Sequence, residues 1–515
     1  MNSAMKPDSK PAQFDGLERA APATRGIDAE AIEAFLDGLE QEGLELHSFM
    51  FWKDGAVIAE GWWAPYAAEL GHMLHSSVKS FVGTGVGLAV DQGLIPLDAK
   101  VVDFFPEHVP ADAPPALFQM TVRHLLTMTS GHGSGISGGE WRRLTTSWIA
   151  AFFKEPMVYA PGERFVYCSG CSYMLAAILQ KVTGERVRDW MEPRFFAPLG
   201  IQDLAWDVGP EGVNTGGNGI RAKTADLLKL ALVHMHGGAW QGRQLLSQAW
   251  TAAATGAQIK DIVIGHFDGK RYADPSAPGA EKREGYGYQW WRGPDNTFTA
   301  SGLFGQHAIA FPDHNAVIAF TGGIAPREKR VHRLLREHIV ADMQRQRAPS
   351  AAPTAQAVRA DAALAQRLAA LALPIEHNTS IPASRAAFQG SYAVEPNDDG
   401  ITGIAIDCAG DRCTFTLTDG RGQHTVTASF STWTDGQTSM TGWQLHHSYQ
   451  PEQTRVFARA FWRTENELVL DWIFIETAFR DHVVCRFDGK DMTYDRRVNT
   501  NSMRKEMDQL SAHSS

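Results

Sequence analysis

Cysteine is scarce in this chain, and long hydrophobic runs are missing from it. The 515 residues include five cysteines, and no stretch approaches the roughly 18 consecutive apolar residues of a membrane span. The N-terminal residues MNSAMKPDSKPAQFDG are polar and lack the apolar core of a secretory signal. The sequence therefore predicts a cytoplasmic protein with reduced thiols and no membrane partner.

An excess of basic residues is also missing. The 58 acidic residues outnumber the 48 lysines and arginines, and the formal net charge is −10 at pH 7. A nucleic-acid partner is therefore not expected. The hydrophobic content of 44% and the charged content of 21% are typical of a globular protein. The length suggests two or three domains.

Two short motifs have the spacing of metal or redox sites but lack the required context. Cys168 and Cys171 form CSGC without a second ligand pair or a thioredoxin-like βαβ unit. We interpret them as two small apolar residues at a helix start. His234 and His236 in VHMHGG lack a third ligand and fit the end of a helix. We therefore predict no metal and no other cofactor.

The first two thirds of the chain read as a mixed α+β domain. Residues 27–44 have helical periodicity, and residues 48–63 form two apolar runs around the turn KDG, which indicates a hairpin. Helical segments follow, and strands return between residues 285 and 323. Strands at both ends with helices between them predict one antiparallel sheet with a helical insertion, which we place in residues 26–345.

The last third has a different pattern. Pro, Ala and Gln gather after residue 346, so residues 346–383 are predicted to be a linker with a short helix. Short alternating segments between residues 384 and 495 predict a small β-barrel or sandwich. Residues 1–25 and 496–515 are expected to be loose ends.

The segment HSSVKSF contains a candidate nucleophile. Ser76 and Lys79 are three residues apart and would share one face of a helix. A serine hydroxyl needs a base beside it and donors for the oxyanion, and a helix N-terminus supplies backbone amides. The S-x-x-K pattern alone would equally fit a helix start with a solvated lysine.

Two later segments favour the catalytic interpretation. Tyr167 precedes Ser169 by two residues, and TASGLFGQ places Gly302 and Gly305 on an expected strand, where a backbone must approach something closely. S-x-x-K, Y-x-S and a late glycine-containing strand, in this order, resemble the serine β-lactamase and D,D-peptidase clan. Segments such as DQGLIPLDAKVVDFFPE, TVRHLLTMTSG and FFAPLGIQD agree.

Within that clan, the chain resembles one branch over roughly residues 25–345. This branch holds class C β-lactamases, family-VIII esterases, D-aminopeptidases, 6-aminohexanoate-dimer hydrolases and linearised-microcystin hydrolases. The resemblance implies a β-lactamase/transpeptidase-like fold. It also implies that the C-terminal part is the lipocalin-like accessory barrel found on some members.

The resemblance implies a role for each matching residue. Ser76 would attack the substrate carbonyl and become acylated. Lys79 and Tyr167 would form the base system, with the charge of Lys79 lowering the pKa of Tyr167. The backbone N–H groups of Ser76 and Leu303 would form the oxyanion hole.

Substrate contacts are expected from Ser169 and from the third motif, which is Ala300, Ser301 and Gly302. Ser169 stands where the family usually has asparagine and loses the paired donor and acceptor of the amide. Ala300 stands where the family usually has lysine or histidine, which would help bind a substrate carboxylate. This difference argues against an efficient β-lactamase.

Several further residues are candidates by position alone. His307 either lines the pocket or faces a neighbouring side chain. Trp141 ends the glycine-rich segment 135–141, which we predict to cover the cleft. One of Trp290 and Trp291 should point to the core and the other outward. His72, His75 and His124 lie near these motifs; the first two flank the nucleophile, and the third is expected to be structural.

Together, these observations predict a serine hydrolase that forms an acyl-enzyme and cleaves amides of a small molecule or short peptide, such as one with D-residues. An esterase of short-chain acyl esters is the first alternative, since both reactions use the same machinery. A non-catalytic binding relative is the second, although retention of Ser76, Lys79 and Tyr167 argues against it. A homo-oligomer is compatible with the sequence.

Overall fold

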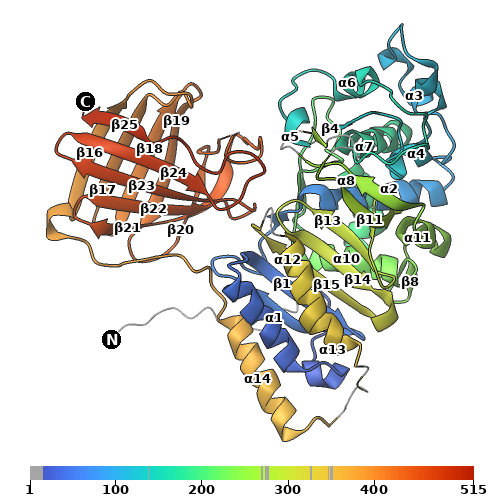
Figure 1. Cartoon of the computed structure of the whole chain (residues 1–515), viewed down its shortest axis with the longest axis horizontal. Helices are drawn as coiled ribbons and strands as arrows, with labels where there is room; N and C mark the ends of the chain where they lie inside the picture. Colours follow the sequence, from blue (N-terminus) through green and yellow to red (C-terminus); the bar gives the residue numbers. More distant parts are fainter. Residues whose placement is uncertain are drawn as a thin grey trace.

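The computed structural model describes residues 15–136, 138–267, 271–272, 278–324, 328–345, 347, 352–442 and 444–514. An α+β domain and a β-barrel lie side by side, joined through helix α14 (Ala355–Ala369) and the segment after it (Figure 1). This arrangement confirms the predicted fold class.

Strands from both ends of the α+β domain form one antiparallel sheet, as predicted. The strand order is β2-β1-β15-β14-β13-β12-β11-β9. The N-terminal strands β1 (Leu46–Lys53) and β2 (Ala56–Trp62) are joined by a turn in which Asp54 and Gly55 have positive φ. The other strands are β9 (Ile259–Ile264), β11 (Glu281–Tyr286), β12 (Trp291–Arg292), β13 (Phe298–Gly302), β14 (Gln306–Phe311) and β15 (Ala316–Gly322).

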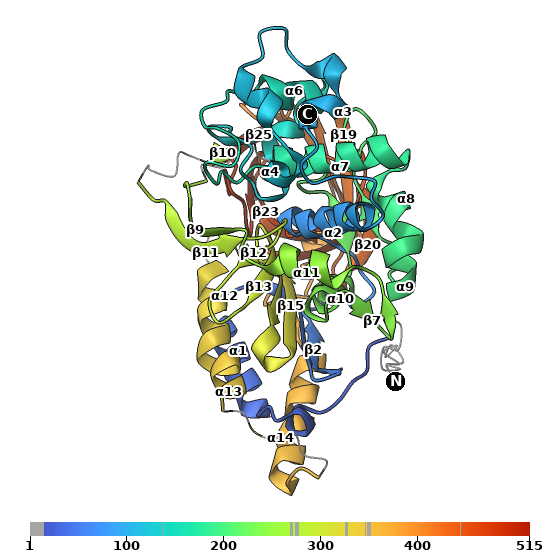
Figure 2. The same cartoon turned by 90° about the vertical axis from the view of Figure 1, so that its right-hand side faces the viewer.

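Helices cover both faces of this sheet because its strands alternate their side chains. Met50 and Trp52 of β1 join the core that contains α2 (Val78–Asp91), α7 (Ser169–Thr183) and α10 (Thr224–Met235). Phe49 and Phe51 point the other way and join the core with α1 (Ala29–Gln41), α12 (Glu328–Leu334) and α14. Figure 2 shows α2 above the strands β12, β13 and β15, while α12 lies at the left of the sheet.

The insertion between β2 and β9 is mostly helical, as predicted. Its further helices are α3 (Val101–Phe104), α4 (Val122–Leu126), α5 (Gly138–Trp141), α6 (Trp148–Lys154), α8 (Val187–Met191), α9 (Ala197–Leu199) and α11 (Gln248–Thr255). Its short strands are β3 (His72–Met73), β4 (Gly135–Ile136), β5 (Ala205–Trp206), β6 (Ile220–Ala222), β7 (Ala239–Trp240) and β8 (Arg243–Gln244), and β10 (Arg271–Tyr272) lies between β9 and β11. The last helix of the domain is α13 (Ala341–Met343).

Helix α14 lies within residues 346–383, where we predicted a linker with a short helix. It begins at Ala355, and the Thr354 hydroxyl caps it by accepting from the Ala357 N–H at 3.2 Å. Leu364 and Leu368 are one turn apart and buried in the core shared with α1 and β2. A one-sided leucine pattern therefore outweighed the loop-like composition. Residues 346 and 348–351 lie outside the described residues.

The C-terminal part is a barrel. Among the residues that the structure describes, nine strands form a ring closed by a parallel contact between Ser429 of β19 and Arg459 of β21, while β20 pairs with β21 outside the ring. The strands are β16 (Ala387–Val394), β17 (Gly403–Ala409), β18 (Arg412–Asp419), β19 (Gly422–Ser429), β20 (Thr434–Thr438), β21 (Thr454–Thr464), β22 (Glu467–Ile473), β23 (Arg480–Asp488), β24 (Asp491–Val498) and β25 (Leu510–Ser514). Alternating buried residues fill the interior.

The chain ends differ from the prediction of loose segments. Strand β25 pairs with β24 and β16, with Leu510 and Ala512 facing the interior, so the tail completes the barrel. At the other end, Arg19 makes ion pairs with Asp15 and Glu60, which fixes residues 15–25 against β2. Residues 1–14 of the predicted loose segment lie outside the described residues.

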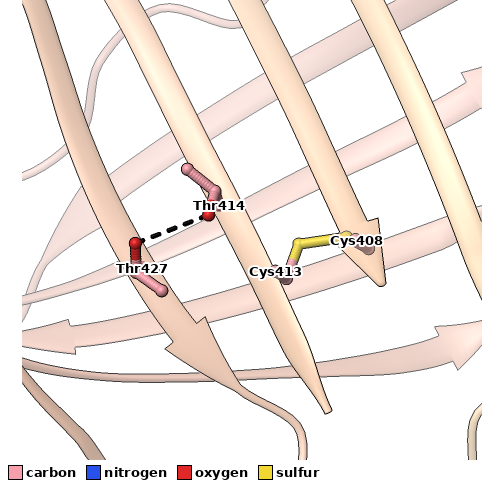
Figure 3. The surroundings of a disulfide bond; sticks show 4 residues. All are labelled: Cys408, Cys413, Thr414 and Thr427. Carbon is pink, nitrogen blue, oxygen red and sulfur yellow. Dashed lines mark hydrogen bonds between the residues drawn. A yellow bond between two sulfur atoms is a disulfide. The ribbon is translucent and has the colours of Figure 1, made fainter. Parts of the chain in front are cut away.

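One pair of cysteines also differs from prediction. Cys408 and Cys413 lie directly opposite each other on β17 and β18 and form a disulfide (Figure 3). The prediction that all thiols are reduced is therefore wrong for this pair, which the strand register brings together. Cys168, Cys171 and Cys485 are free and buried.

The barrel is anchored to the α+β domain beside the segment that leads to Ser76. Arg480 pairs with Glu45 at 2.7 Å, and the Asn499 amide donates to the same carboxylate at 2.7 Å. The Met73 N–H donates to the Glu476 carbonyl at 2.7 Å. The barrel thus contacts the chain three residues before the candidate nucleophile.

Candidate active site

Ser76 lies in a tight turn and lines a large cleft. The turn is the 3-10 helix η2 (His75–Ser77), which leads directly into α2. His75 has a φ of 46°, a left-handed conformation that is uncommon for a residue with a side chain. The next hydroxyl, that of Ser77, donates to the Gln306 carbonyl at 2.7 Å and ties the turn to β14. The cleft that Ser76 lines has a volume of about 1890 Å³.

Lys79 lies beside Ser76, one helical turn further along α2. Its ammonium nitrogen Nζ is 2.9 Å from Ser76 Oγ, 3.1 Å from Ser169 Oγ and 3.0 Å from the Gly217 carbonyl. The residue is 1% exposed. Burial lowers the pKa of Lys79 to about 7, because the charged form loses its hydration. A substantial fraction is therefore an uncharged amine near neutral pH, and only that form can accept a proton.

Tyr167 completes this group, but not with the electrostatics that we expected. Its ring centroid lies 5.0 Å from Lys79 Nζ and 5.0 Å from the ring of Trp291. Burial raises the pKa of Tyr167, and its hydrogen bond with Ser76 only partly opposes this effect. The expected lowering by Lys79 is therefore wrong. A neutral phenol can donate a proton but is a poor proton acceptor.

The third motif approaches the nucleophile through Gly302. A Cβ added there would lie 2.1 Å from the Leu74 carbonyl oxygen, so only glycine lets β13 come this close to the turn. Ser301, Gly302 and Leu303 line the same cleft as Ser76. Ala300 does not, because its side chain is fully buried on the opposite face of the strand. The expected substrate contact by Ala300 is therefore not present.

Of the two other predicted substrate contacts, one lies in the cleft and one in the core. His307 lines the cleft, opposite Ser301 on the neighbouring strand. Trp141 instead packs in the core, with ring centroids 5.2 Å from those of Trp148 and Tyr173, so the prediction of a cleft contact is wrong. The indole ring is large and mostly apolar, so packing against these two aromatic side chains in the core is favourable.

The paired tryptophans and the lid segment were also predicted. Trp290 is fully buried and Trp291 lines the cleft, which confirms the predicted alternation. In the segment 135–141, Gly135–Ile136 forms strand β4, which pairs with β10. Residue 137 lies outside the described residues, and the lid remains a prediction.

The remaining histidines and the CSGC pair have structural neighbours. His72 Nε2 is 3.0 Å from His47 Nδ1, while His124 forms a capping box with Thr121 at the start of α4. His234 Nδ1 contacts the Leu230 carbonyl at 2.9 Å. Cys168 occupies the N-cap position of α7 and Cys171 lies in its first turn, so the pair is at a helix start, as predicted. Within the described ranges, no three His, Cys, Asp or Glu side chains lie close enough to hold a metal ion.

Two features of the site were missed from the sequence. Gly217 accepts from Lys79 and lies so close to Ser169 that an added Cβ would be 2.6 Å from the serine Cβ. The segment NTGGNG was a usable signal for such a close approach. His447 and Ser502 of the barrel also line the cleft. Nothing in the local sequence connects these two residues to Ser76.

Comparisons with known proteins found relatives of the α+β domain. A model of the beta-lactamase family matches residues 31–341. The 6-aminohexanoate-dimer hydrolase of Paenarthrobacter ureafaciens is 25% identical over 318 residues, which cover 58% of this chain and 78% of that protein. Esterase EstB of Burkholderia gladioli is 28% identical over 148 residues, which cover 26% of this chain and 38% of that protein.

A solved structure supports the fold. A presumptive beta-lactamase of Bacteroides dorei superposes with a TM-score of 0.51 at 16% identity, covering 62% of this chain and 99% of that one. This identity is low enough that the likeness concerns the fold alone. Among the helices that the structure describes, none is long and apolar enough to cross a membrane.

Proposed function

Because this chain belongs to the beta-lactamase family, we propose that it is a serine hydrolase that cleaves amide bonds of small molecules or short peptides through an acyl-enzyme on Ser76. One observation carries this proposal: a buried lysine, Lys79, lies 2.9 Å from the hydroxyl of a serine in a strained turn that lines the cleft. A buried amine next to a serine Oγ supplies the base that a serine nucleophile needs.

The proposed reaction begins with proton transfer from Ser76 Oγ to the uncharged amine of Lys79. The oxygen attacks the substrate carbonyl carbon, and the resulting oxyanion accepts hydrogen bonds from the backbone N–H groups of Ser76 and Leu303. The phenol of Tyr167 donates its proton to the leaving amine as the C–N bond breaks, and the proton that Lys79 took from Ser76 then returns to Tyr167. A water molecule then attacks the carbonyl carbon of the acyl-enzyme, with the same groups moving the protons in the opposite direction. The carboxylic acid is released and Ser76 is regenerated.

The substrate class follows from two observations. The third motif, Ala300–Ser301–Gly302, presents no cationic side chain to the cleft, which argues against efficient hydrolysis of a substrate with a carboxylate such as a β-lactam. A relative that is matched over 78% of its length is named as a 6-aminohexanoate-dimer hydrolase. An esterase is the second candidate, because a relative named as an esterase matches part of the domain.

Mass spectrometry of the intact protein tests the proposal. After incubation with a fluorophosphonate, wild type should carry one adduct that maps to Ser76, and Ser76→Ala should carry none. A Ser77→Ala variant is the matched control and should keep the adduct, since its hydroxyl faces Gln306. Matched p-nitroanilides and p-nitrophenyl esters then separate amidase from esterase. Absence of both adduct and turnover would favour a non-catalytic binding protein.

A further inference from the structure

A loop of the barrel reaches the cleft that contains Ser76. The connection between β20 and β21 places His447 in the cleft lining, and the connection between β24 and β25 adds Ser502. Figure 1 shows the loops of the barrel facing the α+β domain. The cleft is therefore built by both domains, although the family match ends at residue 341.

The imidazole of His447 lies beside both turns of the proposed oxyanion hole. Its ring centroid is 6.1 Å from that of His75, which directly precedes Ser76. It is 5.8 Å from that of Phe304, which directly follows Leu303. In the proposed reaction, the N–H groups of Ser76 and Leu303 hold the oxygen of the substrate carbonyl. The side chain of His447 would then contact the group that is bonded to this carbonyl carbon.

His447 is also part of a series of rings around the nucleophile. Its centroid lies 6.2 Å from Phe267, which lies 4.9 Å from Tyr272, which lies 5.2 Å from Tyr167. We name His75, Tyr167, Phe267, Tyr272 and His447 the aromatic collar; all five line the cleft. Such rings bind flat apolar groups by stacking and edge contacts.

The α+β domain fixes the barrel loop in this position. Arg142 donates to the His447 carbonyl at 3.2 Å, and its guanidinium lies 5.0 Å from the ring centroid of Tyr449. Arg221 donates to the Tyr449 hydroxyl at 2.8 Å. His447 Nδ1 is 2.6 Å from Ser502 Oγ, which leaves Nε2 as the ring nitrogen available to a substrate.

Backbone strain at this loop is consistent with a functional position. His447 and Ser448 have φ values of 49° and 60°, so two successive residues with side chains are left-handed. Such conformations persist only where the surroundings determine them, and they concentrate at functional sites. Burial lowers the pKa of His447 to about 3, and Arg142 adds to this effect. Burial lowers the pKa of His75 as well, so both imidazoles are uncharged near pH 7.

We propose that His447 is a substrate-contacting specificity residue, and that the aromatic collar selects substrates whose acyl group carries an aromatic or similarly flat uncharged ring. The inference rests on the proposed function, because it assigns the acyl preference of the same site. It gives the barrel a direct part in substrate recognition.

A selectivity ratio tests this inference. The measurement is kcat/KM for 4-nitrophenyl phenylacetate divided by kcat/KM for 4-nitrophenyl acetate, in which the leaving group is the same. Wild type should favour the phenylacetate, and His447→Asn should lower the ratio by about 5- to 10-fold. Asparagine suits this position because it tolerates positive φ. His447→Phe should retain most of the ratio, because it keeps a ring.

The controls separate this inference from the proposed function. His513→Ala removes an exposed histidine on β25, outside the cleft lining, and should leave the ratio unchanged. If wild type is labelled at Ser76 but His447→Asn keeps the wild-type ratio, the inference is wrong and the proposed function stands. If wild type has no adduct and no turnover, the proposed function fails and the inference fails with it.

Discussion

Lys79 changes its protonation in the pH range where the protein would be assayed, since burial lowers its pKa to about 7. The protonated form cannot accept the proton of Ser76, so the active fraction grows as pH rises through this value. We expect kcat/KM for an activated ester to increase between about pH 5.5 and about pH 8, with a midpoint near 7. A pH–rate profile of the wild type measures this directly.

Substitution of Lys79 should confirm the origin of that profile. Lys79→Met should lower kcat/KM by about 10³-fold or more, because Ser76 loses its base. Lys229 offers a matched control: it is also a fully buried lysine, but it donates to the Leu199 carbonyl away from the site. Lys229→Met should keep the wild-type midpoint. A wild-type profile that is flat through pH 7 would contradict the assignment of Lys79 as base.

For single residues, the sequence pattern identified the candidate catalytic group but did not predict the pKa values within it. Ser76, Lys79 and Tyr167 could be predicted together because their spacing and order match a known motif set. The raised pKa of Tyr167 could not be predicted from the sequence. It arises from burial among rings such as those of Tyr272 and Trp291, which are distant in sequence. The prediction for Trp141 was wrong for the same reason, because its contacts with Trp148 and Tyr173 form only when the chain folds.

Strand β13 and the nucleophile turn meet at a contact that only glycine permits. A Cβ at position 302 would lie 2.1 Å from the Leu74 carbonyl oxygen, so the turn or the strand must shift. We expect Gly302→Ala to lower kcat/KM by about 10²-fold, because displacement of about 1 Å misaligns Ser76 and Leu303. The same assays and a thermal unfolding curve measure the effect.

Gly420 provides the control for that substitution. It has open space where a Cβ would be added and lies in the turn between β18 and β19, far from the cleft lining. Gly420→Ala should therefore leave kcat/KM unchanged. If Gly302→Ala were as active as wild type, the strand would not need to approach the turn so closely, and the oxyanion role of Leu303 would lose its support.

The sequence predicted those helices, strands and turns that local residue patterns determine. It did not predict the elements that depend on packing against distant parts of the chain. The turn at Asp54 and Gly55 and the alternating barrel strands were visible in the sequence. Helix α14 was partly missed because its Ala- and Gln-rich start resembles a linker until its leucines meet α1. Strand β25 was missed because it is short and becomes a strand by pairing with β24 and β16.

Residues of both domains line the cleft that contains Ser76. The connection between the domains could not be predicted, because the contacting residues come from opposite ends of the chain. Glu45 lies beside β1, whereas Arg480 begins β23. The pair is mostly buried. Burial alone would raise the pKa of Glu45, but Arg480 and His47 lower this pKa to about 2. The pair therefore contributes stability above about pH 4.5, which is lost as pH falls toward 2.

Breaking this pair should weaken both the fold and the site. Arg480→Met leaves a buried carboxylate without its cation, so we expect the free energy of unfolding to fall by about 2–4 kcal/mol. The double variant with Glu45→Gln should be less destabilised than the single one, since the orphaned charge is gone. Urea denaturation measures both. Arg455→Met, which breaks an exposed pair with Asp435 in the same barrel, should cost at most about 1 kcal/mol.

The link to the nucleophile makes the same variant informative about function. Glu476, four residues before Arg480, accepts from the Met73 N–H, so loosening this loop frees the segment that leads to Ser76. We expect Arg480→Met to slow fluorophosphonate labelling of Ser76 while the protein is still folded, and Arg455→Met to leave the rate unchanged. Wild-type labelling by a destabilised Arg480→Met would mean that the barrel shapes the cleft without positioning the nucleophile.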